Sequence, residues 1–215
     1  MNNNEAPLEP AAIAALLRNN VFNLKVEDIG LTLDKCPAVW GVMMELGYPE
    51  LVISLVVLAD GSCSVYLSDG GGAVGCGLYS EVRQVAASML RVAQRMLSHC
   101  QPTFIYPLAT DARVRFYLLT GAGVLTTESS RHEMDEGASE MAEVYYAGHS
   151  VIGMIELLGA GIDLVDEVRM AQAELARPGT DTDTTGTDSM AISRSRGRTC
   201  RILPSAGNVV RRWHN

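Results

Sequence analysis

The apolar residues of the chain follow two periods, one typical of strands and one typical of helices. Residues 51–58, LVISLVVL, form a nearly continuous apolar run rich in β-branched side chains, which predicts a strand covered on both faces. Residues 39–46 predict a second strand, and the alternating residues 63–68 predict a third. Asp60-Gly61 lies between residues 51–58 and residues 63–68 and is a hairpin signal, which predicts that the three strands form a β-meander.

Helical periodicity appears on both sides of this meander. Residues 10–22 carry a proline at the first helical position and several alanines, which favour a helix. Residues 81–99 place their apolar side chains on one face and predict an amphipathic helix with Ser80 as its N-cap. The period returns over residues 141–158, where two internal glycines leave open whether there is one helix or two, and residues 162–175 can add a last amphipathic turn.

Further strands are predicted after the central helix. The apolar runs 103–108 and 114–119 predict a hairpin, and residues 124–127 predict a third strand. A helix that follows a meander and precedes a hairpin fits an α+β fold better than a doubly wound parallel sheet. We therefore expect a single domain with a largely antiparallel β-sheet and helices packed on it.

Composition divides the chain into a folded part and a tail. The chain has 215 residues, of which 47% are apolar, enough to bury a core without disulfide or metal staples. We place this α/β globular domain at residues 8–175. Residues 176–215 begin with a polar low-complexity run, TDTDTTGTDS, and continue as an Arg-rich segment, which predicts a disordered tail.

Charge and cysteine content indicate which classes of partner the protein can bind and in which cellular compartment it is expected. The net charge is −8, so the acidic body should repel nucleic acid and anionic membranes. From Arg194 onward the tail has arginines and no acidic residue, so nucleic acid could bind only there. No apolar run has the length of a membrane span and the N-terminus does not resemble a signal peptide, which predicts a cytoplasmic protein. Five cysteines, an odd number without close pairs, indicate reduced thiols rather than disulfides or structural zinc.

One glycine-rich segment is a candidate ligand site. Gly70, Gly72 and Gly75 match the spacing G-x-G-x-x-G between a predicted strand and a predicted helix, and Asp69 and Cys76 flank them. This pattern supports a small-molecule or nucleotide-binding enzyme as the alternative function. The preceding strand belongs to a hairpin, and the predicted helix begins about five residues after Gly75 instead of within the motif. Both observations favour a connector between sheet and helix.

The other catalytic patterns fail on spacing. Residues 148–153, GHSVIG, resemble a serine-hydrolase elbow, but the second glycine comes one residue late and the segment is predicted to be helical. None of the four histidines pairs at metal-ligand spacing, and the acidic residues around His132 form a solvated segment. We therefore assign no catalytic or metal-ligating residue and expect no cofactor.

The order of predicted elements resembles the roadblock/longin-like (profilin-like) domains. The resemblance covers residues 10–158 and rests on the first helix, the strand LVISLVVL running into Asp60-Gly61, the glycine-containing exit, and helix 81–99 with the strands and helix that follow. This chain has three predicted strands before the central helix, where that family has two. The resemblance implies a non-catalytic module that dimerises and engages a small GTPase or a larger assembly.

These observations together predict a non-enzymatic protein-interaction or scaffold module that self-associates as a homodimer. Methionine-bearing helical faces and the long apolar strand supply surfaces suited to plastic packing against a protein partner. A GTPase-regulator-like platform is the specific form that the family resemblance suggests.

Overall fold

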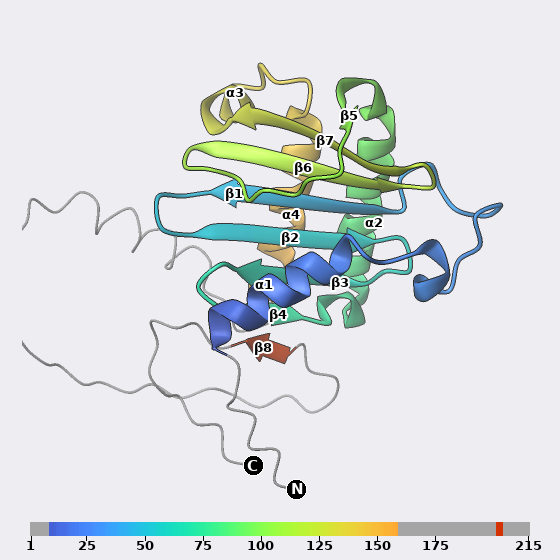
Figure 1. Ribbon diagram of the computed structural model, residues 1–215, viewed down its shortest axis with the longest axis horizontal. Helices are drawn as coiled ribbons and strands as arrows, with labels where there is room; N and C mark the ends of the chain where they lie inside the picture. Colours follow the sequence, from blue (N-terminus) through green and yellow to red (C-terminus); the bar gives the residue numbers. More distant parts are fainter. Residues whose placement is uncertain (1–8, 159–200, 204–215) are drawn as a thin grey trace, which may run out of the picture.

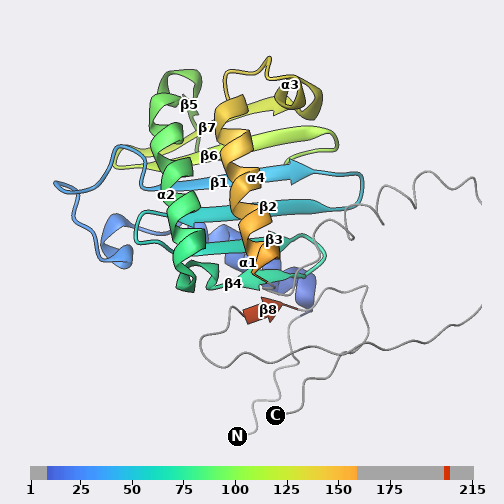
Figure 2. The same ribbon diagram turned by 180° about the vertical axis from the view of Figure 1, so that it is seen from behind.

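The computed structural model describes residues 9–158 and 201–203, which form one eight-stranded sheet with helices on both faces (Figures 1 and 2). The strand order is β5-β7-β6-β1-β2-β3-β4-β8, and each of these pairings is antiparallel. This confirms the predicted α+β class. In chain order the elements are α1 (Pro10–Val21), η1 (Val26–Ile29), β1 (Gly41–Gly47), β2 (Val52–Leu58), β3 (Cys63–Leu67), β4 (Gly72–Val74), η2 (Cys76–Leu78), α2 (Ser80–Arg95), η3 (Leu97–His99), β5 (Gln101–Pro102), β6 (Arg113–Thr120), β7 (Gly123–Ser130), α3 (Arg131–Asp135), α4 (Ala142–Leu157) and β8 (Arg201–Leu203).

The sheet has two apolar faces, which explains the nearly unbroken apolar runs of β1 and β2. Alternate residues of a strand point to opposite faces. Val42 and Met44 of β1 pack in the cluster under α2 and α4, whereas Met43 packs in the cluster on the α1 side. All seven residues of β1 and all seven of β2 are buried, as expected for central strands covered on both sides.

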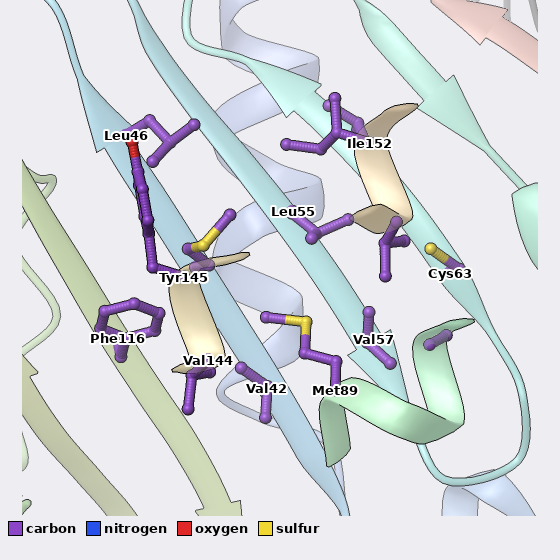
Figure 3. Packing of buried hydrophobic residues seen from close by; sticks show 14 of the residues in the cluster. Val42, Leu46, Leu55, Val57, Cys63, Met89, Phe116, Val144, Tyr145 and Ile152 are labelled. Carbon is purple, nitrogen blue, oxygen red and sulfur yellow. The ribbon is translucent and has the colours of Figure 1, made fainter. Parts of the chain in front are cut away.

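Helices α2 and α4 lie side by side across one face of the sheet (Figure 2). Figure 3 shows Met89 of α2 and Val144 and Ile152 of α4 directed at the side chains of the central strands. A Cβ atom at Gly148 would lie 2.6 Å from the Met44 sulfur, so glycine lets α4 approach the sheet closely. Residues 142–157 form one continuous helix, which answers the question left open by the two glycines.

Several local predictions were wrong. Residues 103–108 form a loop instead of a strand, because β5 ends at Pro102 and prolines at 102 and 107 cannot donate to a ladder. The segment 69–77 is not a continuous loop, since it contains β4 and the start of η2. Ser80 is the first residue of α2 rather than its N-cap; Tyr79 occupies that position.

The predictions for the C-terminal part fall mostly outside the described residues. This applies to the last amphipathic turn at 162–175, to the end of the domain at 175, and to most of the tail at 176–215. Residues 201–203 are the exception, because they form β8 and pair with β4. The prediction of a disordered tail did not anticipate this strand.

Candidate functional site

Two adjacent, strongly exposed large apolar side chains of the described residues lie on the loop between β5 and β6. Phe104 is 91% exposed and Ile105 is 75% exposed. The loop crosses the α1 face of the sheet over β6 and β1 (Figure 1). Contiguous exposed apolar side chains are candidates for a contact surface.

A buried ion pair fixes the far end of this loop. Arg18 of α1 contacts Glu45 of β1 with 2.6 Å between Nε and Oε1, and Glu45 has no exposed surface. Ser54 of β2 donates its hydroxyl to the same carboxylate oxygen at 3.2 Å. The backbone N–H of Ala109, at the end of the loop, donates to the other oxygen at 3.1 Å. A buried carboxylate is tolerated only when it is paired and hydrogen-bonded, and here the loop supplies one of its donors.

The middle of the loop is held through one carbonyl. The Pro107 oxygen accepts hydrogen bonds from Arg18 Nη2 at 3.2 Å, from Arg115 Nη1 at 3.1 Å and from the Tyr117 hydroxyl at 2.5 Å. The Tyr106 ring stacks on Phe22 with 4.0 Å between ring centroids. Helix α1 and strand β6 therefore both contribute to the position of this loop.

Two arginines of β6 form a second charged group beside the loop. Arg113 donates to Glu128 of β7 at 2.9 Å between Nε and Oε1, and Arg115 donates to the other oxygen at 2.7 Å. Burial alone would raise the pKa of Glu128, but the hydrogen bonds and charges of Arg113 and Arg115 outweigh it and lower the pKa. Glu128 is thus held as a carboxylate and is not suited to act as a general acid.

A pocket of about 420 Å³ opens between the loop and the outer strands β7 and β6. Its charged and titratable lining groups are His99, Arg115, Tyr117 and Glu128. Arg115 and Glu128 satisfy each other, and Tyr117 is bound to the Pro107 carbonyl. Three of these four side chains thus already have polar partners within the protein. The remaining lining residues are Gln101, Pro102, Thr103, Ile105, Pro107, Thr126 and Thr127.

A second polar cluster lies between the β1–β2 turn, α3 and α4. The Tyr145 hydroxyl donates to Asp135 at 2.7 Å, and the His149 ring packs edge-on against Tyr145. Arg131 lies over the Tyr48 ring, 3.9 Å from its centroid. Desolvation, followed by the hydrogen bond and charge of Asp135, raises the pKa of Tyr145. These contacts join the ends of three elements, so we interpret the cluster as structural.

Packing, backbone conformation or a turn hydrogen bond accounts for the glycines and for Asp69 of this segment. A Cβ at Gly70 would lie 2.3 Å from the Cβ of Pro10, so this turn supports the start of α1. A Cβ at Gly72 would lie 2.3 Å from the Val65 carbonyl oxygen of the paired strand β3, and Gly75 has a φ of 76° before η2. Asp69 accepts a hydrogen bond from the Gly71 N–H at 3.1 Å, as in a tight turn.

Cys76 is fully buried in the core beside this segment. Its thiol is therefore shielded from solvent. Ligand binding by Asp69, Gly70, Gly72, Gly75 and Cys76 stays a prediction, because the structure brings these residues together only as neighbours along one hairpin and its exit.

The resemblance of residues 148–153 to a hydrolase elbow does not extend to the structure. Ser150 lies inside α4 and donates its hydroxyl to the Tyr146 carbonyl at 3.0 Å. The acidic segment around His132 forms α3, with a capping box between Ser130 and Glu133. Over residues 9–158 and 201–203, no group of histidine, cysteine and acidic side chains is arranged to hold a metal ion.

The residues that build the loop site were not singled out from the sequence. Glu45 was a usable signal, because it is the single charged residue in the apolar strand VWGVMMEL. A charge inside a strand covered on both faces requires a buried partner. The run TFIYPL at 103–108 looked like a strand, and only the structure shows that its first two large side chains face solvent.

Comparison with known proteins adds no assignment to this geometry. In the part of the chain that the structure describes, no helix combines the length and the apolar character needed to cross a membrane. Searches against protein-family models, curated proteins and solved structures found no match for the chain. The resemblance to roadblock/longin-like domains therefore stays a hypothesis that rests on element order.

Proposed function

We propose that this protein is a cytoplasmic, non-enzymatic protein-interaction module that uses the loop 103–108 as its contact surface. The observation that carries the proposal is the exposure of Phe104 and Ile105 on a backbone held by Glu45 and by the Pro107 carbonyl. Aromatic and aliphatic side chains that enter a partner pocket supply a large share of binding energy. Burying one such side chain contributes about 1.5–3 kcal/mol.

The fixed backbone makes this surface more effective than a mobile loop would be. Binding costs free energy when a segment must become ordered, and a segment already held in place avoids that cost. The loop 103–108 is attached to α1 and β6 by hydrogen bonds and to Phe22 by the Tyr106 ring stack, and Ala109 directly after it is bonded to β1. The backbone directly after the two exposed side chains is therefore already ordered before a partner with an apolar pocket binds.

The proposal includes self-association as a homodimer, as expected from the sequence. The family resemblance adds a small GTPase, or a larger assembly built on one, as the specific partner class. A second copy of the chain and a small GTPase are thus the two partners proposed to bind the loop 103–108. A second copy of the chain and a GTPase are separable by experiment, because the first forms from purified protein alone.

Affinity capture with the full chain tests the proposal. The double variant Phe104→Ser/Ile105→Ser should lose a partner that the wild-type chain retains, and sedimentation velocity of the purified proteins should show whether that partner is a second copy. Leu33→Ser is the matched control, since Leu33 is 61% exposed on another loop. Equal capture and equal self-association by the double variant and the wild type would refute the role of this loop.

A further inference from the structure

The last strand of the sheet comes from a segment remote in sequence from the strand that it pairs with. Strand β8 is the outermost strand beside β4 (Figure 1). The antiparallel register places Gly72 opposite Leu203, Ala73 opposite Ile202 and Val74 opposite Arg201. The free edge of β4 is thus a site that accepts an extended strand, and the main chain supplies the pairing.

Strand β8 has few residue pairs with β4 and lies far along the chain from the end of α4. Three residue pairs join β8 to β4, whereas residues 159–200 separate β8 from the end of α4. Pro204 follows β8 in the sequence and has no N–H with which to extend the ladder. Because only three residue pairs hold β8, few main-chain hydrogen bonds must open before the strand leaves the β4 edge.

We propose that the β4 edge is a strand-acceptor site through which two copies of this chain associate by exchanging residues 201–203. The occupant is defined by the structure, because the same residues already pair with this edge in one register. When two copies exchange these residues, each β4 edge keeps the same three residue pairs that it has within a single chain. The resulting dimer has twofold symmetry and no unpaired acceptor edge. The exchanged dimer therefore needs no new complementary surface.

Protein concentration sets the balance between the two arrangements. Pairing within one chain does not depend on the protein concentration, whereas pairing between two chains does. Pairing within one chain therefore dominates in dilute solution, and exchange grows as the protein is concentrated. This inference concerns the sheet edge opposite β5 and does not depend on the loop 103–108.

A disulfide across the register tests both the pairing and the exchange. Val74→Cys and Arg201→Cys are introduced together into the full chain after Cys36, Cys100 and Cys200 are changed to serine, and the protein is mildly oxidised at a series of concentrations. We expect an intramolecular disulfide at low concentration and a reducible covalent dimer whose fraction rises with concentration. A dimer fraction that does not rise would overturn the exchange, and the absence of any disulfide would overturn the pairing itself.

Two controls separate strand pairing from random collision. Ile202→Pro in the same double-cysteine chain removes a backbone N–H from β8 and should abolish both disulfides. Thr103→Cys with Arg201→Cys places one thiol at the opposite edge of the sheet and should give neither product. Dimers that persist with Ile202→Pro, or that form equally with Thr103→Cys, would contradict the proposal without bearing on Phe104 and Ile105.

Discussion

Replacing Glu45 by glutamine tests whether the buried ion pair holds the loop. The substitution keeps the shape of the side chain and removes its charge. Arg18 then remains buried without a counter-charge, since its side chain is 8% exposed. The Ala109 N–H and the Ser54 hydroxyl also face an amide in place of a carboxylate.

The expected loss of stability is large for a single substitution. Removing one partner of a buried ion pair costs about 3–5 kcal/mol. Arg18 keeps its hydrogen bonds to Pro107 and Asn19, so we expect a value near the lower end, about 3 kcal/mol. A typical domain has a free energy of unfolding of about 5–15 kcal/mol, and a change of this size lowers the melting temperature by about 6–12 °C.

Urea unfolding followed by the fluorescence of buried Trp40 measures the free energy, and amide hydrogen exchange over residues 103–109 measures the loop. The matched control is Glu143→Gln, because Glu143 pairs with Arg95 on the surface with both side chains more than half exposed. This control should change the stability by less than about 0.5 kcal/mol. A loss below about 1 kcal/mol for Glu45→Gln, or unchanged exchange at Ala109, would show that the ion pair does not hold the loop.

Three further predictions follow from the same structure. Because the pKa of Glu128 is lowered in the folded state, its carboxylate stabilises the fold at a pH above the ordinary pKa of 4.5. This contribution is lost as the pH falls through the folded-state pKa. Glu128→Gln should therefore flatten the acid limb of a plot of unfolding free energy against pH. Desolvation is the main cause of the lowered pKa of His149, so the free energy of unfolding should fall as the pH drops below 6.5. His149→Gln should remove this dependence of the melting temperature on pH between pH 7 and the folded-state pKa. If the glycine-rich segment binds no nucleotide, a thermal-shift panel with NAD, NADP, ATP and GTP should be flat; a shift of several degrees that Asp69→Asn or Gly75→Ala removes would favour the enzyme alternative.

Most of the sheet could be predicted from local pattern. The runs 51–58 and 63–68 and the hairpin signal between them correspond to β2 and β3, because period and turn chemistry agree there. The segment 103–108 shows the limit of this reasoning. Its apolar residues are typical of a strand, but its proline lacks the N–H that a β-ladder hydrogen bond requires. The Tyr106 ring instead stacks on Phe22 on the α1 side of the sheet.

The loop site could not be predicted because it depends on residues that are distant in sequence. The Arg18–Glu45 pair joins positions 27 residues apart, and the Glu45–Ala109 hydrogen bond joins positions 64 residues apart. A charge in a buried strand shows that a partner exists but does not identify it. Strand β8 was missed for a related reason, since three residues within a polar tail carry no periodic signal and acquire structure only by pairing with β4.

In the proposed function, Phe104 and Ile105 form the contact surface of an interaction module. Photo-cross-linking detects such a contact, with benzoylphenylalanine in place of Phe104 in the full chain, in cells that naturally produce the protein. We predict a discrete protein adduct from position 104, either with a second copy or with another protein, and no such adduct when the cross-linker replaces Leu33. Absence of an adduct at position 104, or the same adducts from both positions, would contradict the account.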